Sequence, residues 1–458
     1  MEGQRSEWTI INLYPYQQQD LDFFSGWGRS ANFSEPGVGK TPVGVRLIHR
    51  LEGIPCLIVC PNVVRYHWED EIKRFWKGEP PNIVQYQGSA NERREISQPD
   101  VLIVNYELFR LDFEHYFSKF EYKMTLFDEA HRLKNRKAKV TKCAYKLKTK
   151  YIHLITGTPI TNQFDDIWSY LRLLFPEQFG SYWKFINRYG NLANNGFGTE
   201  IIGVRQDRLP QLTKTIQQFS IRRRKKDVLP DLPDKTYQTI YVDLTPKQRK
   251  AYEEMKKFMV ASLGKEEIEV PNIVSQLMRL RQITLTPKLA GFESDESSKL
   301  PALLELLQER KLAGKKTVVM SEFKQWIDIL ENKLNTHNIS TVRITGAEDH
   351  FEQRRSQQTF QNGKADVALC TIRAAGLGID LTASDMIIFT DIAWNDTDNK
   401  QAEDRIHRAT QKGNAQIVRL FAKDTLDHVI LNRTILKAIT AGQILSEDIQ
   451  HLEQLLSA

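Results

Sequence analysis

Residues 124–131 read MTLFDEAH, an apolar run that ends in two adjacent carboxylates, Asp128 and Glu129. The part Met124–Phe127 has the length and composition of a buried strand. Two carboxylates at the end of such a strand cost free energy unless they meet a cation. We interpret Asp128 as a group that holds Mg²⁺ through water and Glu129 as the group that orients and polarises an attacking water. The alternative is that the four residues Asp128–His131 (DEAH) lie on a surface helix and have no catalytic role.

Similar apolar runs recur along the chain and alternate with amphipathic stretches, as in a parallel sheet with helices on both faces. In the first half, the predicted strands are Leu57–Cys60, Val101–Val104, Met124–Phe127 and Tyr151–Ile155. In the second half, they are Val318–Met320, Thr341–Ile344, Val367–Thr371 and Met386–Thr390. The predicted helices of the two halves are Thr41–Leu51, Leu300–Leu312 and Trp326–Leu334. The sequence therefore predicts two α/β lobes in tandem rather than one long sheet.

Between the two halves the pattern changes to largely helical stretches. The predicted helices there are Phe164–Arg172, Ser181–Tyr189, Pro246–Leu263 and Asn272–Arg281. We expect Asn191–Gly203 to be a loop, because it is rich in Gly and Asn. A boundary near Pro230–Lys235 divides the chain into residues 1–230 and residues 231–458. Each lobe then carries a helical insertion near the junction, and the second ends in a helix.

Residues 34–41 read SEPGVGKT and precede the predicted helix Thr41–Leu51. Glycines let a backbone approach a phosphate closely, and the positive end of the following helix favours an anion. In this pattern Lys40 reaches the β- and γ-phosphates and the Thr41 hydroxyl faces Mg²⁺. The alternative is a glycine turn that only caps a helix. The expected nucleotide-binding residues are Glu35, Pro36, Gly37, Val38, Gly39, Lys40 and Thr41.

Two further stretches carry groups suited to a nucleotide. Gln17, in Leu13–Gln17, can donate to and accept from one adenine edge at once, although a Gln near a chain start is usually solvated. Gln401, Arg405 and Arg408 are spaced to share one face of a helix. Two guanidinium groups on one face repel unless a polyanion arrives, and an Arg can stabilise charge on a transferring phosphoryl group. The alternative is a solvated helix in which Glu403 and Asp404 balance the charge.

The composition sets only loose limits. The 458 residues include 64 basic and 57 acidic side chains, giving a net charge of +7 and a pI near 9.0. This mild excess fits a polyanionic partner without requiring one. The start of the chain lacks the apolar core of a signal peptide, and no run approaches the ~20 residues of a membrane span. We expect a soluble intracellular protein with no membrane partner and with reduced cysteines.

Taken in order, these stretches resemble the SWI/SNF-type branch of helicase superfamily two, in its DEAH-box form. The resemblance covers about Leu13 to Asp427. It is carried by Leu13–Gln17, Glu35–Thr41, Leu57–Pro61, Asn105–Glu107, Asp128–Asn135, Thr156–Pro159, Leu277–Ile283, Val318–Phe323, Ala375–Asp385 and Gln401–Gln411. It implies two RecA-like lobes with ATP and Mg²⁺ bound between them.

The resemblance also assigns roles to residues. It places Gln17 at the adenine, Lys40 and Thr41 at the phosphates and Mg²⁺, and Asp128 and Glu129 at the metal and the water. It places Gln401, Arg405 and Arg408 at the γ-phosphate, and Gly378 and Asp380 near the nucleotide, with Asp380 a candidate ribose contact. Thr156 and Thr158 would couple hydrolysis to lobe movement.

The chain departs from the pattern of this branch at a few positions. Ser34 stands where the branch usually has an acid, and Pro36 stands where it has Met, which stiffens the loop. Asn105 replaces a common Thr, and Thr410 replaces a Gly. None of these changes removes a charge that the mechanism needs.

The expected partner is DNA, with duplex favoured and with contacts to phosphates that carry no sequence information. Candidate contacts are Asn62, Asn105, Tyr106, Thr345, Gly346, Thr371 and Arg373, although for each residue taken alone a capping or loop role is favoured over a DNA contact. For the basic run Arg222–Lys226 we prefer a coupling or DNA-contact role over a nuclear-localisation signal or a solvated helix face. For Trp68, Trp168 and Trp326, core packing is favoured over base stacking.

The favoured function is an ATP-driven motor that moves along duplex DNA and remodels DNA or protein–DNA complexes. One alternative is a helicase that separates DNA or RNA strands, but no segment long enough for a strand-splitting hairpin or wedge is evident. Another is a nucleic-acid-binding scaffold with an idle ATPase, which the intact charged residues oppose. We expect a monomer in the cytoplasm of a bacterial or virus-infected cell, or in the nucleus if the source is eukaryotic.

Overall fold

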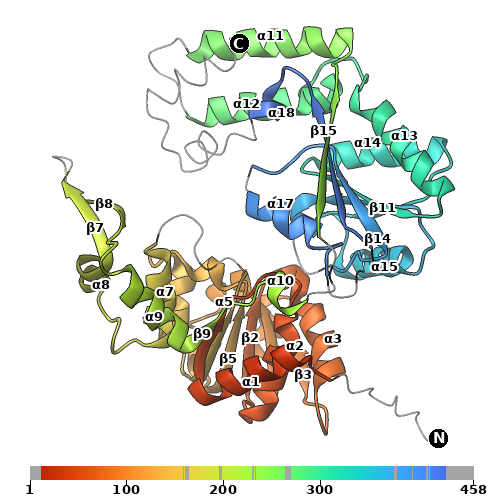
Figure 1. The fold of residues 1–458 in the computed structure, drawn as a ribbon. Coiled ribbons are helices and arrows are strands. Elements are labelled where there is room, and N and C mark those ends of the chain that lie inside the picture. The colour runs from red at the N-terminus through yellow and green to blue at the C-terminus, as the bar shows by residue number, and fades with distance from the viewer. Residues whose placement is uncertain are drawn as a thin grey trace, which may run out of the picture. The chain divides into compact units, whose positions relative to one another are not determined.

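The computed structural model describes residues 12–157, 159, 164–194, 199–229, 232, 234–263, 270–375, 379–394, 396–408, 411 and 413–429. The chain divides into two compact units, Met1–Pro230 and Asp231–Ala458, each with its own parallel sheet and its own core (Figure 1). The predicted α/β class with two parallel-sheet lobes is therefore confirmed. Among the described residues, no helix is both long and apolar enough to cross a lipid bilayer.

The first unit is built on a sheet of seven described strands, all parallel, in the order β3-β4-β2-β5-β6-β1-β9. The strands are β1 (Arg29–Asn32), β2 (Cys56–Cys60), β3 (Ile83–Gln85), β4 (Val101–Asn105), β5 (Tyr122–Asp128), β6 (Thr149–Ile155) and β9 (Ser220–Ile221). The helices are α1 (Pro15–Trp27), α2 (Lys40–Arg50), α3 (Arg65–Phe75), α4 (Ala90–Arg94), α5 (Tyr106–Leu111), α6 (Lys139–Lys146), α7 (Asp166–Leu174), α8 (Tyr182–Tyr189), α9 (Leu209–Phe219) and α10 (Lys225–Val228). The four strands predicted for this half are all present.

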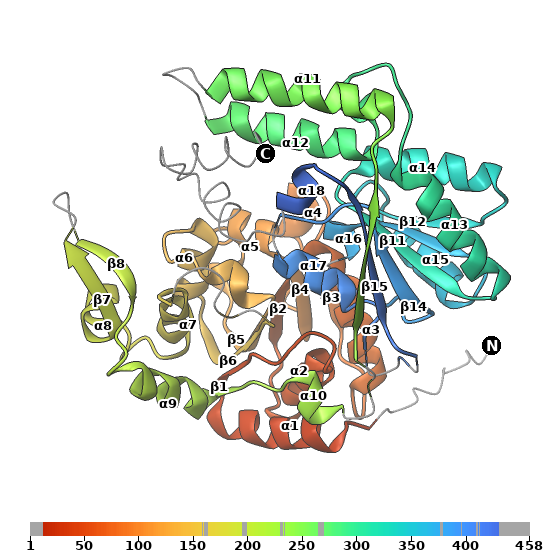
Figure 2. The ribbon, with the colours of Figure 1, turned by 45° about the horizontal axis from the view of Figure 1, so that its top comes forward.

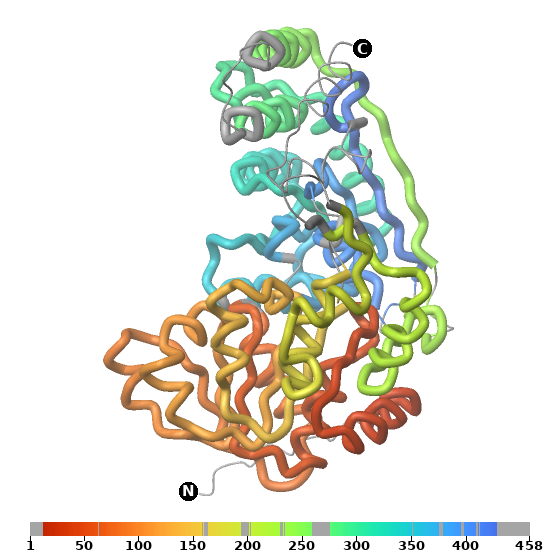
Figure 3. Tube along the Cα trace, turned by 90° about the vertical axis from the view of Figure 1, so that its left-hand side faces the viewer, coloured from red at the N-terminus to blue at the C-terminus, as the bar shows by residue number. Residues whose placement is uncertain are grey.

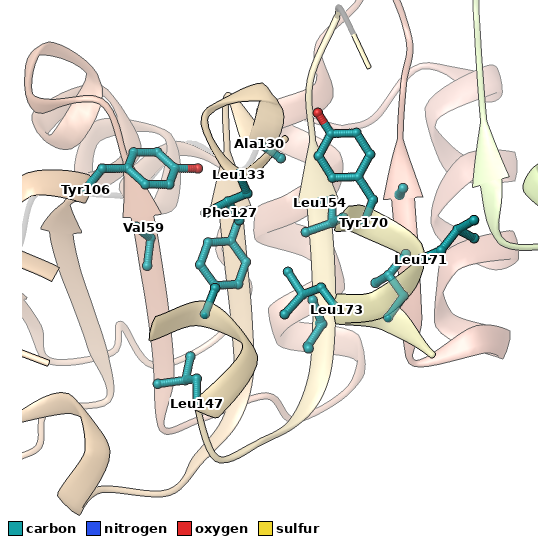
Figure 4. Packing of buried hydrophobic residues seen from close by; sticks show 14 of the residues in the cluster. Val59, Tyr106, Phe127, Ala130, Leu133, Leu147, Leu154, Tyr170, Leu171 and Leu173 are labelled. Carbon is teal, nitrogen blue, oxygen red and sulfur yellow. The ribbon is translucent and has the colours of Figure 1, made fainter. Parts of the chain in front are cut away.

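The strand side chains alternate between two cores, one on each face of this sheet. On β2, Cys56, Ile58 and Cys60 pack in one core with side chains of α1, α2 and α3. Leu57 and Val59 pack in the other core with side chains of α5, α6 and α7. Figure 4 shows part of this second core around Phe127 and Leu154. Burial on both faces explains why these strands appear in the sequence as continuous apolar runs.

The stretch Asn191–Gly203, expected to be a loop, contains most of an antiparallel hairpin. Its strands are β7 (Gly190–Asn194) and β8 (Thr199–Val204), which follow α8 and pair only with each other among the described residues (Figure 2). The loop prediction was wrong because Gly and Asn lowered the strand signal, while the cross-strand ladder is set by backbone hydrogen bonds. The β7–β8 hairpin was not anticipated from the sequence, where no segment long enough for a strand-splitting hairpin or wedge was evident.

The second unit has six described strands, again all parallel, in the order β10-β15-β14-β11-β13-β12. They are β10 (Thr236–Val242), β11 (Lys316–Ser321), β12 (Thr341–Ile344), β13 (Val367–Thr371), β14 (Ser384–Phe389) and β15 (Gln416–Ala422). The helices are α11 (Pro246–Leu263), α12 (Val270–Leu285), α13 (Lys299–Leu312), α14 (Lys324–Thr336), α15 (His350–Gln361), α16 (Ile372–Ala375), α17 (Asp396–Glu403) and α18 (Leu426–Val429). The predicted strands of this half are present, and β10 and β15 were not anticipated.

The helical insertion of the second unit is the pair α11 and α12, which lie side by side (Figure 3). The buried Gln248 of α11 donates from its amide to the carbonyls of Ile283 and Leu285 on α12, at 3.1 and 3.5 Å. The last part of α12 packs against the sheet through the buried Leu285. The helices predicted at Pro246–Leu263 and Asn272–Arg281 are therefore confirmed.

Candidate functional site

The phosphate-loop candidate, residues 33–39, links the end of β1 to the start of α2. Gly37 and Gly39 have φ angles of +84° and +76°, in the left-handed region that glycine adopts without strain. Gly39 is the residue before α2, so the first turn of that helix follows directly on the loop. The Lys40 ammonium donates to the carbonyls of Ser34 and Glu35 at 2.9 and 3.0 Å. Thus Lys40 lies along the inner side of the loop, as a phosphate-binding lysine should.

Gln17 of α1 contacts this loop directly. Its Nε2 donates to the carbonyls of Val38 and Gly39, both at 3.3 Å, and its Oε1 accepts from the backbone N–H of Tyr14 at 2.9 Å. Both amide protons are therefore used by the backbone. The structure thus gives Gln17 a role in fixing the loop, and the adenine contact stays a prediction, because it requires these bonds to be exchanged.

Pro36 packs against the segment that follows β6. A Cβ atom placed on Gly157 would lie 2.9 Å from Pro36 Cδ, so only a glycine allows this approach. The N–H of the neighbouring Thr156 donates to the Asn32 carbonyl of β1 at 3.1 Å. The segment after β6 and the phosphate loop are therefore in direct contact. Thr158 lies outside the described residues.

Asp128 ends β5 and is held by two donors. Its Oδ2 accepts from Trp68 Nε1 of α3 at 2.8 Å, and its Oδ1 accepts from the Glu129 N–H at 2.9 Å. Burial and the neighbouring Glu129 raise the pKa of Asp128 to about 6, while Trp68 and Lys40 act in the opposite direction. The positive charge of Lys40 therefore favours the ionised form of Asp128.

Glu129 has an unusual backbone conformation. Its φ and ψ angles of 50° and 49° place a non-glycine residue in the left-handed region, which costs about 1–2 kcal/mol. Its carboxylate lies 3.1 Å from His131 Nδ1, and the same nitrogen lies 3.4 Å from the Thr156 hydroxyl. His131 therefore connects Glu129 to the segment after β6. Strain of this kind is found at sites where a side chain must be aimed.

The second unit carries the other predicted group of polar residues, and here the local structure differs from the prediction. Helix α17 ends at Glu403, so Arg405 and Arg408 lie in the turns that follow and do not share a helix face with Gln401. The backbone tightens because the Arg405 N–H donates to the Ala402 carbonyl at 3.1 Å. Each guanidinium then reaches back along the chain. Arg405 Nε donates to the Gln401 carbonyl at 3.1 Å, and Arg408 Nε donates to the Asp404 carbonyl at 3.4 Å.

These turns pack on the segment before β14. Arg408 donates to the Ile379 carbonyl at 2.8 Å, and the Leu381 N–H donates to the Arg405 carbonyl at 3.0 Å. Asp380, between these two residues, accepts from the Thr382 N–H at 3.0 Å. The structure therefore brings Arg405, Arg408 and Asp380 onto adjoining segments. Gly378 lies outside the described residues.

The acids of α17 do not form a solvated, exposed face. Glu403 and Asp404 are 1% and 8% exposed, and Lys235 Nζ lies 3.0 Å from a carboxylate oxygen of each. Glu403 also accepts from the Tyr237 hydroxyl at 3.0 Å and pairs with Arg419 at 3.3 Å. The alternative of a solvated helix is therefore wrong, because Lys235, which directly precedes β10, and Arg419 of β15 pair with these buried acids.

Comparison with known families decides the classification. The SNF2-related domain matches residues 16–289, which is more than half of the chain, and the helicase conserved C-terminal domain matches residues 298–410. The chain belongs to the SNF2 family of helicase superfamily two. The first match runs across the boundary at Pro230–Asp231 into the second unit, and the second match lies wholly within the second unit.

Individual relatives agree with this assignment. An uncharacterized ATP-dependent helicase of Mycoplasma pneumoniae is 27% identical over 468 residues, covering 97% of this chain and 43% of that protein. The ISWI chromatin-remodeling complex ATPase ISW1 of Saccharomyces cerevisiae is 29% identical over 463 residues, covering 93% of this chain and 40% of that protein. The SNF2-family chain spans less than half of the length of these relatives. A solved structure, the Sulfolobus solfataricus SWI2/SNF2 ATPase core in complex with dsDNA, is 26% identical with a TM-score of 0.47 and covers 99% of this chain and 97% of that chain.

The candidate DNA contacts of the SNF2-family chain separate by exposure. Tyr106 is 3% exposed and donates its hydroxyl to the Asp128 carbonyl at 2.7 Å, so it supports the strand end and does not face a partner. Asn105 caps α5 by accepting from the Leu108 N–H. Thr345 is buried and bonded to Glu348. Thr371 is 8% exposed, whereas Asn62 and Gly346 are exposed, as is Arg373, whose side chain is 80% exposed.

Three residues of the site were not recognised from the sequence. Trp68 was assigned to core packing, which is correct for its ring and misses its N–H. His131 and Lys235 were given no separate role. The apolar stripe of a helix predicts that the Trp68 ring is buried. The hydrogen bond from its N–H to Asp128 at the end of β5 is evident only from the three-dimensional structure.

Proposed function

We propose that this SNF2-family chain hydrolyses ATP on binding DNA and uses the energy to move along duplex DNA. The observation that carries the proposal is the arrangement at the end of β5. Lys40 lies inside the phosphate loop and acts electrostatically on Asp128, and Glu129 is held in a strained conformation beside it. The match to the SNF2-related domain supports the same activity.

The residues fit a nucleotide with its magnesium ion. Mg²⁺ prefers one or two protein oxygens and keeps several waters, and the Thr41 hydroxyl and the Asp128 carboxylate are donors of that kind. When bound, Mg²⁺ neutralises charge on the β- and γ-phosphates. In the DEAH-box form that we propose, Lys40 binds phosphate, Asp128 would hold Mg²⁺ through water, and Glu129 orients the attacking water. Gln17, Asp380, Gly378 and Gln401 complete the nucleotide contacts, and Arg405 and Arg408 supply positive charge to the γ-phosphate.

DNA is the proposed partner, bound as a duplex through its phosphates. The yeast relative ISW1 is a chromatin-remodeling complex ATPase, and this similarity favours a duplex over a single strand. Among the sequence candidates, Asn62, Gly346 and Arg373 remain suitable contacts because they are exposed. We further propose that the chain acts as a monomer in the cytoplasm.

The test is the ATPase rate of the full chain with duplex, single-stranded and forked DNA and with single-stranded RNA. Duplex DNA should raise the rate most, and equal stimulation by RNA would contradict the proposal. Lys40→Ala and Glu129→Gln should abolish turnover while leaving the thermal unfolding transition in place. An active Glu129→Gln variant would mean that another residue positions the water.

The hairpin β7–β8 favours a second candidate function, strand separation, because a projecting two-stranded element is the kind of wedge that splits a duplex. Two assays distinguish the candidates. Displacement of a triplex-forming strand without unwinding of a fork supports movement along intact duplex. Efficient fork unwinding that is lost when residues 190–204 are replaced by a Gly/Ser linker supports strand separation.

A further inference from the structure

The basic run Arg222–Lys226 is divided by the structure into two sets of side chains. Arg222, Arg224 and Lys226 are exposed, whereas Arg223 is partly buried and Lys225 is 8% exposed. The run follows β9 as extended chain and enters α10 at Lys225 (Figure 2). Because side chains alternate along extended chain, neighbouring cations of this run face different surroundings.

The backbone of this segment is hydrogen-bonded to the phosphate loop at Ile221 and Arg223. The Phe33 N–H donates to the Ile221 carbonyl at 2.8 Å, and the Glu35 N–H donates to the Arg223 carbonyl at 2.9 Å. In return, the Arg223 N–H donates to the Ser34 hydroxyl at 3.0 Å. These bonds continue the β1–β9 ladder beyond the two paired residues of each strand.

The side chains lock the same segment in place. The Glu35 carboxylate accepts from the Lys225 N–H at 2.8 Å. The Arg223 guanidinium pairs with Asp20 of α1, with Nε at 2.9 Å and the terminal nitrogen at 2.8 Å from Oδ1. The Asp20 side chain is 4% exposed. Loss of Arg223 would therefore leave a buried carboxylate without its counterion, which is costly.

The consequence is that α1 and the 221–225 segment hold the phosphate loop from both ends. Gln17 of α1 holds the Val38–Gly39 end, and residues 221–225 hold the Phe33–Glu35 end. Arg223 joins the two supports through Asp20. Removing it should loosen the loop without removing any group that contacts the nucleotide.

We propose that residues 221–225 are a positioning segment for the nucleotide site and that Arg223 is its key residue, acting on the loop through Ser34, Glu35 and Asp20. The segment fixes the loop in the shape that wraps phosphate, so that ATP binds without first ordering it. The same segment runs on in sequence to β10 of the second unit, which begins at Thr236. The proposal deepens the proposed ATPase function and concerns its nucleotide site.

The primary experiment follows backbone hydrogen exchange in the full chain without nucleotide, comparing wild type with Arg223→Gln. Exchange should rise in residues 33–39 and 221–225 and stay unchanged in β4 and in the second unit. Arg224→Gln is the matched control, because it removes an exposed cation from the next position and should leave exchange at the loop unchanged. Unchanged exchange at residues 33–39 in Arg223→Gln overturns the proposal whether or not the protein hydrolyses ATP.

The second measurement is binding of a fluorescent ADP analogue, together with steady-state kinetics. Arg223→Gln should weaken binding and raise the KM for ATP by roughly tenfold, the value of one charge-assisted hydrogen bond, with kcat at saturating ATP within about twofold of wild type. Arg223→Lys should restore part of the affinity. In the Asp20→Asn/Arg223→Gln double variant the effect should be no larger than in Arg223→Gln alone. A fall in kcat with unchanged KM, or an equal effect of Arg224→Gln on affinity, contradicts the assignment.

Discussion

At the scale of single residues, Asp128 is a group whose ionisation opposes folding. Its pKa is raised to about 6 by burial and by Glu129, so the folded protein loses stability as pH rises from about 4 toward 7, where the unfolded chain ionises first. Asp128→Asn should therefore raise the Tm of the nucleotide-free protein by a few degrees at pH 7.5 while abolishing turnover. The difference in Tm from wild type should narrow steadily as the pH is lowered to 4. A variant less stable than wild type at pH 7.5 would refute this account.

Trp68 is the residue that favours the ionised form of Asp128. Its N–H donates to Oδ2 at 2.8 Å, so Trp68→Phe should raise the Asp128 pKa further. We expect the Mg²⁺ concentration for half-maximal ATPase at pH 6 to increase about threefold to tenfold, as for a lost hydrogen bond to a charged group, and the pH profile to move to higher pH. Trp326→Phe is the control, because Trp326 is equally buried and donates to Thr390 in the second unit. Equal shifts in both variants would indicate a general loss of packing.

The site residues differ in how far the sequence could predict them. Lys40, Asp128 and Glu129 stand in short motifs, and their chemistry depends on residue type and spacing alone. Trp68, Tyr106 and Arg223 act through contacts between segments far apart in sequence. For Arg405 and Arg408, the predicted placement on a shared helix face was wrong, and their role at the γ-phosphate stays a prediction. Spacing of i and i+4 predicts a shared face only if the helix continues, and here it ends at Glu403.

At the scale of elements, the junction of α1 with the phosphate loop leaves no space for a side chain at Gly39. A Cβ atom there would lie 2.2 Å from Gln17 Nε2, and the φ angle of +76° is unfavourable for alanine. Gly39→Ala should therefore raise the Kd for a fluorescent ADP analogue at least tenfold, since strain at such a position costs about 1–3 kcal/mol. Gly26→Ala, in α1 with no atom within 4 Å of the added Cβ, should bind as wild type. Gln17→Ala should recover part of the loss in the double variant, and no recovery would mean that backbone strain alone is responsible.

The elements that were predicted correctly are those whose buried side chains are apolar. Strand β1, Arg29–Asn32, leads directly into the phosphate loop, but its residues are mostly polar and the sequence did not predict it as a strand. Its buried polar groups are satisfied locally. The Ser30 hydroxyl lies 2.9 Å from His153 Nδ1, and Asn32 Oδ1 accepts from the Ser34 N–H at 3.1 Å. Because these hydrogen bonds allow polar side chains to be buried, β1 lacks the apolar pattern on which strand prediction depends.

At the scale of the whole molecule, the two sets of residues proposed to act on ATP lie in units with separate cores. Lys40, Asp128 and Glu129 belong to the first unit, and Arg405 and Arg408 belong to the second. Each set is ordered by bonds inside its own unit, such as Lys40 to Ser34 and Arg408 to Ile379. If Arg405 and Arg408 act on a nucleotide bound by the first unit, a substitution in the second unit should lower hydrolysis and leave nucleotide binding to the first unit intact.

Arg405→Gln tests this separation. The variant should bind a fluorescent ADP analogue with a Kd within about twofold of wild type, because the phosphate loop is intact. Its DNA-stimulated kcat should fall by roughly 10³-fold, the range seen when an arginine that stabilises the transferring phosphoryl group is removed. Lys423→Gln is the control, since Lys423 is a cation of the same unit that pairs with Asp243 at the surface. If Arg405→Gln lowered nucleotide affinity and turnover by the same factor, Arg405 would act in ground-state binding, and hydrolysis would not depend on a group supplied by the second unit.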